Sequence, residues 1–104
     1  MPNHLQTILL GTAVADALGV PVEFKPRSVL KENPVTDMRE YGTYHLPKGT
    51  WSDDTSLMLC LAESIVEGLD LNKLVQKFIA WKNDNYWTPR GWVFDIGIGT
   101  RIAI

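Results

Sequence analysis

The sequence predicts an all-α fold, and three features of its 104 residues support this. Apolar and small residues recur at helical spacing in residues 5–18, 53–66 and 71–83. Two of these stretches follow residues that commonly cap helices, Ser52 and Asp70. With 45% apolar residues and four Trp, the chain can build a core of its own, so we expect one compact unit.

Composition excludes several classes of function. Ten basic and twelve acidic residues give a net charge of -2, and no basic cluster is present to follow a nucleic-acid backbone. The N-terminal stretch lacks a basic region and carries Asp16 among its apolar residues, unlike a signal peptide or a membrane span. The single cysteine, Cys60, lies among apolar residues and is expected to pack as a small hydrophobe. We therefore predict a cytoplasmic protein with no nucleic-acid or membrane partner.

The first helix is predicted to end near Leu18, because Gly19 and Pro21 follow it. Residues 19–50 then contain four prolines and no sustained periodicity, although residues 35–46 could form a short pair of strands. Connections of this length are uncommon in compact domains, and ordered ones often bind ligands. The sequence thus predicts one long proline-containing loop that serves as a lid.

Residues 53–66 are apolar nearly all round, with Ser56, Glu63 and Glu67 as one narrow polar stripe. This pattern is typical of a central helix with neighbours on most sides. The next helix follows Asp70 and ends near Asn83. Its apolar face is formed by Leu71, Leu74, Val75, Phe78 and Ile79, while Lys73, Gln76 and Lys77 are expected to face water.

A turn-rich connection leads to a last predicted helix that begins at Asp95. It runs into the apolar residues Ile102, Ala103 and Ile104 without a capping residue. We therefore expect residues 1–104 to form a single incomplete domain, cut from a longer architecture. Exposed apolar segments commonly mark interfaces, so a homo-oligomer or a second chain that completes the fold is expected.

The stretch GTWSDDTS, residues 49–56, is the main candidate for chemistry. One interpretation is structural: Ser52 or Asp53 caps the helix, and the acidic residues offset its dipole. The other is a metal site, because Mg²⁺ prefers the oxygen ligands that Ser52, Asp53 and Asp54 carry. Two adjacent carboxylates repel each other unless a cation or a proton intervenes. The two interpretations are compatible.

A magnesium site needs further acidic residues, and the nearest candidates are Asp16 and Glu23. Asp16 lies in an otherwise uncharged helix, where a carboxylate needs a partner. Its structural alternative is a hydrogen bond that ties the helix to the loop. For Glu23 the alternative is a surface salt bridge with Lys25 or Arg27, which would stabilise little.

Three stretches together resemble the ADP-ribosylglycohydrolase family, which includes the dinitrogenase-reductase-activating glycohydrolases. They are AVADALGVPVEF, KGTWSDDTSLMLCLAESI and FDIGIGTRIAI, and the resemblance covers nearly the whole chain. The middle motif is specific, whereas DALG and DIG alone are weak signals. The resemblance implies an all-helical, N-terminal part of a hydrolase with two Mg²⁺ ions, or alternatively Mn²⁺. Its substrate would be an ADP-ribosylated protein or a related small molecule.

The resemblance also implies roles for single residues. Ser52, Asp53 and Asp54 would be metal ligands, with Ser52 in place of the commoner Thr. Glu23, on the mobile loop, and Asp54 would be the catalytic residues.

Two further parts of the chain match the family. Asp95 and Gly97 would lie near the substrate, and Asp16 would support the site, in a motif where Ala15 replaces a common Gly.

The second acidic cluster of the family belongs to its C-terminal half, so this chain carries half of the ligand set. Mg²⁺ is then expected to bind weakly. The alternative function is a non-catalytic helical module that binds an ADP-ribose-like ligand or a partner chain.

Overall fold

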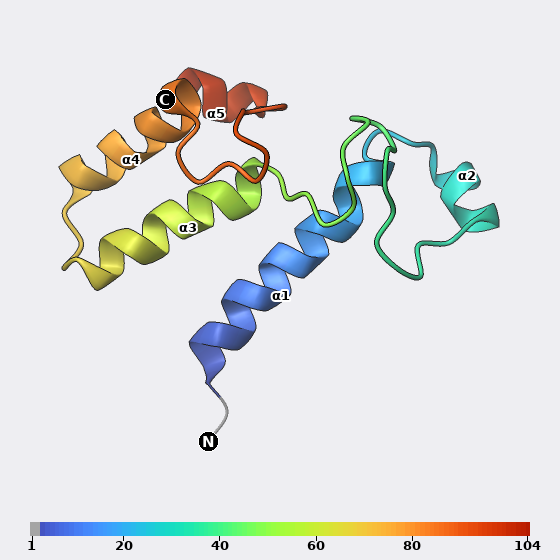
Figure 1. Cartoon of the computed structure of the whole chain (residues 1–104), viewed down its shortest axis with the longest axis horizontal. Helices are drawn as coiled ribbons and strands as arrows, with labels where there is room; N and C mark the ends of the chain where they lie inside the picture. Colours follow the sequence, from blue (N-terminus) through green and yellow to red (C-terminus); the bar gives the residue numbers. More distant parts are fainter. Residues whose placement is uncertain (1–2) are drawn as a thin grey trace. The chain divides into compact units, whose positions relative to one another are not determined.

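A computed structural model describes residues 3–104, which form helices joined by irregular segments and contain no β-strand (Figure 1). The chain divides into two compact units, the first ending at Trp51 and the second running from Ser52 to Ile104. The all-α prediction is confirmed, while the single domain stays a prediction. The elements are α1 (His4–Gly19), the 3₁₀ helix η1 (Val20–Val22), α2 (Arg27–Glu32), α3 (Asp53–Val66), α4 (Leu71–Asp84) and α5 (Ile98–Ala103).

Helix α1 lies where its periodicity predicted it. Its N-terminus is capped by Asn3, whose side-chain oxygen accepts a hydrogen bond from the Gln6 amide at 3.1 Å. At its other end the chain continues into η1, where Pro21 occupies an early position that needs no backbone donor. The stop signal therefore tightens the helix into a 3₁₀ turn before the chain leaves it.

The stretch from His4 to Val22 is long and apolar enough to cross a membrane, by length and composition alone. A core helix of a soluble protein and an N-terminal signal sequence meet the same criterion, so this is weak support for a span. The expectation of no membrane partner stays a prediction.

The long connection after η1 contains a helix that periodicity missed, α2. The guanidinium of Arg39 donates hydrogen bonds to the carbonyl oxygens of Asn33 at 2.8 Å and Pro34 at 3.0 Å. These carbonyls lie at the C-terminal end of α2, where backbone acceptors lack helical partners. Arg39 thus connects part of the predicted loop to the C-terminal end of α2.

The strand pair predicted in residues 35–46 is wrong. Residues 41–46, which we call the clamp turn, form a compact loop in which the Tyr41 amide donates to the Leu46 carbonyl at 2.8 Å. Tyr41 and His45 both have positive φ, 54° and 55°, which a continuous strand does not allow. Two left-handed residues therefore close the chain into a turn before a ladder can form.

Helix α3 packs against α4 in the second unit (Figure 1). The face of α3 that is buried is small and polar, and it includes Ser56, which the sequence placed on one polar stripe with Glu63 and Glu67. The small side chains let α4 approach closely, and the Cys60 thiol lies 3.8 Å from the Lys77 carbonyl oxygen. The buried residues of α3 are Thr55, Ser56, Cys60 and Ser64.

The apolar side chains of α3 and α4 are only partly covered. Leu61 and Ile65 of α3 are exposed, and so are Leu71 and Val75 of α4. Trp81 of α4 is buried, with 1% of its surface exposed. The apolar face of α4 is thus wider than the surface that is buried, and part of it is exposed.

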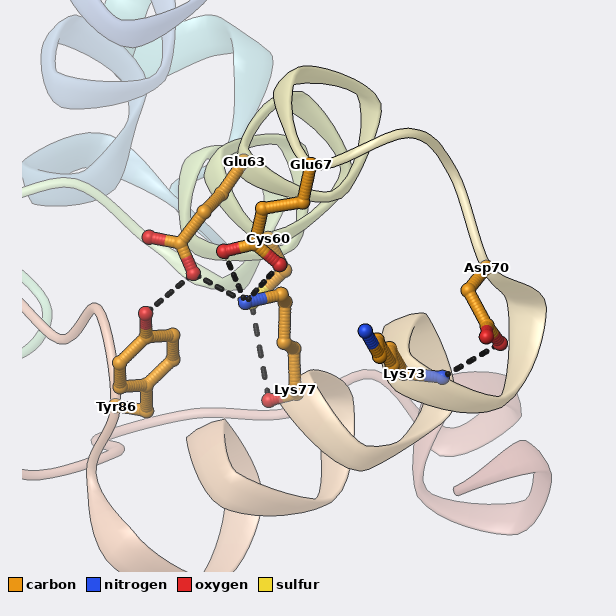
Figure 2. A network of polar contacts seen from close by, with 7 residues as sticks. All are labelled: Cys60, Glu63, Glu67, Asp70, Lys73, Lys77 and Tyr86. Atoms are coloured by element: carbon orange, nitrogen blue, oxygen red, sulfur yellow. Dashed lines mark hydrogen bonds and ion pairs between the residues drawn. The ribbon is translucent and has the colours of Figure 1, made fainter.

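A charged network joins α3 to α4 (Figure 2). The Glu63 carboxylate accepts hydrogen bonds from the Lys77 ammonium and from the Tyr86 hydroxyl, and Glu67 lies 3.4 Å from the same ammonium. Lys77, predicted to face water, is therefore half-buried and paired. The hydrogen bond from Lys77, followed by that from Tyr86, lowers the pKa of Glu63. The hydrogen bond between Lys77 and Glu63 in turn raises the pKa of Lys77.

Cys60 is fully buried, as its apolar neighbours in the sequence predicted. Burial, followed by the charge of Glu63, raises the pKa of its thiol to about 11. Because the thiolate is the reactive form, this cysteine is protected both by the packing and by its protonation state.

Helix α5 begins at Ile98, so the predicted start at Asp95 is wrong. Gly97 has extended angles, φ −61° and ψ 147°, and its amide donates to the Asp53 carboxylate at 3.4 Å. If Asp95 capped a helix, its own side chain would normally accept from that amide. In the structure this amide donates to Asp53 instead, and the helix begins at Ile98, three residues after Asp95.

Candidate active site

The start of α3 shows how the predicted ligands are arranged. Ser52 is extended and caps the helix, and its hydroxyl accepts a hydrogen bond from the Asp54 amide at 3.3 Å. Asp53 and Asp54 occupy the first turn, where the helix dipole favours carboxylates. Ser52 is buried, Asp53 half-buried and Asp54 exposed. The capping interpretation is therefore confirmed for Ser52, and it leaves both carboxylates at the same helix end.

The segment that contains Gly97 contacts this helix end. The Gly97 amide lies 3.4 Å from Oδ2 of Asp53, across 44 positions of sequence. The structure thus brings together Asp53 and Gly97, two residues that the sequence related only through the family resemblance. Asp95 lies two residues before this contact and is half-buried.

A buried serine holds the connection between α4 and α5. The Ser56 hydroxyl donates a hydrogen bond to the Trp87 carbonyl oxygen at 2.9 Å, and 1% of the Ser56 surface is exposed. This contact ties the start of the connection to the first turns of α3, and the Gly97 contact ties its end. The two contacts together fix the loop beside the Asp53 carboxylate.

Glu23 and Asp16 belong to the first unit. Glu23 follows η1 directly and is half-buried, and its carbonyl oxygen accepts a hydrogen bond from the Thr43 hydroxyl at 2.6 Å. Asp16 lies in the last turn of α1, where its carbonyl accepts the Val20 amide. Both acids therefore lie near the junction of α1 and the long connection, and their roles stay predictions.

The donors at the start of α3 fit part of a magnesium site. They are one hydroxyl and two carboxylates, which are hard oxygen ligands, and they come from consecutive residues. Among residues 3–104 no three side chains of the His, Cys, Asp and Glu types are grouped to hold a metal ion.

Sequence reasoning missed two residues that hold this region. The sequence analysis gave Ser56 a place on a polar stripe but no partner, whereas the structure buries its hydroxyl, which donates to the Trp87 carbonyl oxygen. Thr43 lay in residues 35–46, the possible strand pair of the predicted lid. The glycine in YGTY, beside that threonine, was the one available signal, because close approach of backbone is a common reason for glycine in a loop.

The start of α3, where Asp53 and Asp54 lie in one capped turn and the Gly97 amide contacts Asp53, is the candidate site of this all-α chain. The family model for ADP-ribosylglycohydrolase matches residues 3–104, and the chain belongs to that family.

Two curated relatives are both called ADP-ribosylarginine hydrolase Tri1. The protein from Serratia proteamaculans strain 568 is 41% identical over 98 residues, which are 92% of this chain and 26% of the relative. The protein from Pseudomonas putida strain GB-1 is 38% identical over the same shares of the two chains. An uncharacterized protein from Archaeoglobus fulgidus is 39% identical over 69 residues, 64% of this chain and 23% of its own. The chain spans about a quarter of the length of the curated relatives it matches.

Proposed function

We propose that this chain supplies the N-terminal part of the active site of a Mg²⁺-dependent ADP-ribosylglycohydrolase that releases ADP-ribose from modified arginine in proteins. The hydrolase class is supported by membership of the family, and arginine by the names of the two relatives near 40% identity. The observation that carries the proposal is the start of α3, where Asp53 and Asp54 share one turn and Gly97 contacts Asp53.

In the proposed reaction, the bond between ribose C1 and the guanidine nitrogen breaks and a bond from C1 to a water oxygen forms. One proton of that water ends on the departing guanidine nitrogen. The ribose carbon passes through an oxocarbenium-like state, as in other glycoside hydrolyses. Bound Mg²⁺ would lower the pKa of a water ligand and orient the ribose hydroxyls.

The residues of α3 would hold the ions, and a rigid helix end suits that task. Ser52, Asp53 and Asp54 have their backbone fixed by the cap and by the first turn. The Gly97 amide restricts the rotation of the Asp53 carboxylate. Preorganised ligands need little rearrangement when the cation binds.

Glu23 would accept a proton from the attacking water or orient the ribose. It lies on an irregular segment directly after η1, where the chain can move more easily than inside a helix.

The test uses a chimaera, in which residues 3–104 replace the matching segment of the Serratia relative. We measure release of ADP-ribose from arginine-modified protein, with Mg²⁺ and with a chelator. The proposal predicts metal-dependent release that falls by roughly 100-fold in Asp53→Asn and Asp54→Asn, because each carboxylate holds metal. Asp84→Asn, at the end of α4, is the matched control and should keep its activity.

Three results would count against the proposal. The first is an inactive chimaera that is nevertheless folded, the second is release that persists in chelator, and the third is equal activity in the two ligand variants and in the Asp84 control. Any of them would show that these carboxylates do not form the metal part of a working site.

The alternative is a non-catalytic module that binds an ADP-ribose-like ligand or a partner chain. It is favoured by the exposed apolar side chains of the second unit, such as Leu71, Ile98 and Ile102, which are 71%, 82% and 81% exposed. Such side chains would also serve a homo-oligomer or a second chain that completes the fold. Light scattering of the 104-residue chain tests the homo-oligomer, since a dispersed monomer at high concentration contradicts self-association.

A further inference from the structure

The clamp turn is tied to the segment that carries Glu23. The Thr43 amide donates a hydrogen bond to the Pro21 carbonyl oxygen at 3.0 Å. The Thr43 hydroxyl lies 2.6 Å from the Glu23 carbonyl oxygen and 3.3 Å from that of Pro21. One residue thus contacts the backbone on both sides of Val22, across about 20 positions of sequence.

Gly42 allows this approach. A Cβ atom built on Gly42 would lie 1.9 Å from the Pro21 carbonyl oxygen and 2.6 Å from its carbon. These atoms are backbone, so they cannot rotate away. A side chain at position 42 would therefore push the clamp turn off the segment before Glu23.

The residue after Glu23 contacts the same turn. Phe24 has a φ of 66°, which is rare for an aromatic residue, and 79% of its surface is exposed. Its ring lies edge-on to that of Tyr44, with centroids 6.5 Å apart. Uncommon backbone angles persist where the surroundings hold them, and they are found most often at functional sites.

We propose that Thr43 and Gly42 are positioning residues for Glu23: the clamp turn fixes the backbone from which the acid reaches the substrate. The inference rests on the proposed function, in which Glu23 acts on water or ribose. It adds that residues 21–24 and the clamp turn move as one body, so any closure of the loop carries Glu23 and Thr43 together.

The first test uses the same chimaera with four variants. Thr43→Val keeps the shape of the side chain but removes the hydroxyl that donates to Glu23, and kcat should fall about 10- to 100-fold with little change in KM, because the acid is misplaced. Thr43→Ser restores the donor and should stay within about threefold of the parent. Thr36→Val, an exposed threonine of the same connection, is the matched control and should leave kcat unchanged.

The fourth variant separates the inference from the proposed function. If Glu23→Gln keeps full activity, the role of Glu23 is wrong. If Glu23→Gln lowers kcat and Thr43→Val does not, the proposed function stands and the positioning role is wrong. If Thr43→Ser is as impaired as Thr43→Val, the hydroxyl is not what matters, and the inference also fails.

The second test needs no activity and uses the 104-residue chain. Backbone ¹⁵N relaxation reports the order of the Glu23 and Phe24 amides on the ps–ns timescale. In the parent we expect order parameters of about 0.85, and in Thr43→Val of about 0.6 at these two amides, with those of α4 unchanged. Unchanged order at Glu23 in a folded Thr43→Val variant would overturn the inference.

Discussion

The two units are held together in different ways. The second is fixed by side chains: Trp81 of α4 and Cys60 of α3 are buried, and Glu63 binds Lys77 across the two helices. Among residues 3–51 the buried apolar side chains are small, Ala17, Val20 and Pro21, and backbone carbonyls accept many of the contacts. The unit with the proposed metal ligands therefore depends on packed helices, and the unit with Glu23 depends on hydrogen bonds of its loops.

The two units are therefore expected to differ in rigidity. Side chains on a packed helix keep their geometry, while those on a loop move more easily. The predictions below disturb one unit at a time.

The largest effect is expected from Trp81→Ala in the second unit. Removing a fully buried indole leaves a cavity in the second unit and should lower the free energy of unfolding by about 3–5 kcal/mol. The measurement is unfolding in urea, detected through the reaction of Cys60 with a thiol reagent. Cys60 is the single cysteine of the chain, so the signal reports this site alone. Trp92→Ala, at an indole that is 49% exposed, is the control, and an equal effect would show that Trp81 is not central to the packing.

The first unit should respond most to Gly42→Ala. The clash with the Pro21 backbone should cost about 1–3 kcal/mol. Gly11→Ala, in the middle of α1, meets nothing within 4 Å and should stabilise by about 0.5–1 kcal/mol through helix propensity. Thermal unfolding by circular dichroism compares the two; if both substitutions stabilise, the clamp turn does not contact Pro21 closely in solution.

A pair of buried serines on α3 gives a smaller and more selective effect. Ser56→Ala leaves the Trp87 carbonyl without its donor and should cost about 1–2 kcal/mol. The Ser64 hydroxyl is buried and has no hydrogen-bond partner, so Ser64→Ala should be neutral or stabilise by up to about 1 kcal/mol. Chemical denaturation midpoints measure the difference, and equal costs for the two would contradict the assigned contacts.

The smallest effect is the pH dependence of the charged network. The pKa of Glu63 is lowered in the folded state, so the unfolded chain binds more protons in acid. The stability from Glu63 is therefore present above its unfolded pKa and is lost as the pH falls through its lower folded pKa. Glu63→Gln should flatten the fall in stability between about pH 5 and pH 3, whereas Glu32→Gln, at an exposed site of the first unit, should not. Parallel pH profiles would show that the ion pair does not form.

The sequence predicted the elements whose signals are local. Helices α1, α3 and α4 lie where periodicity and the caps Ser52 and Asp70 placed them, because capping depends on neighbours along the chain. The arrangement at the start of α3 was predicted in the same way.

The errors concern features that depend on distant partners. Lys77 was assigned to solvent and Ser56 was given no partner, since a single sequence does not show that Glu63 and Trp87 will face them. The start of α5 was misplaced because Asp53, far back in the chain, accepts from the Gly97 amide. The clamp turn was missed for the same reason, since its acceptors are the carbonyls of Pro21 and Glu23.

The proposed binding of divalent cations at the start of α3 can be tested most directly with Mn²⁺ and the 104-residue chain. A bound paramagnetic ion broadens nearby amide signals, even when it binds weakly. We predict that titration broadens the amides of Asp53, Asp54 and Gly97 first, that Mg²⁺ competes, and that Asp53→Asn removes the effect. Broadening that is equally strong at the acidic residues Asp70 and Asp84, or none at the start of α3, would contradict the account.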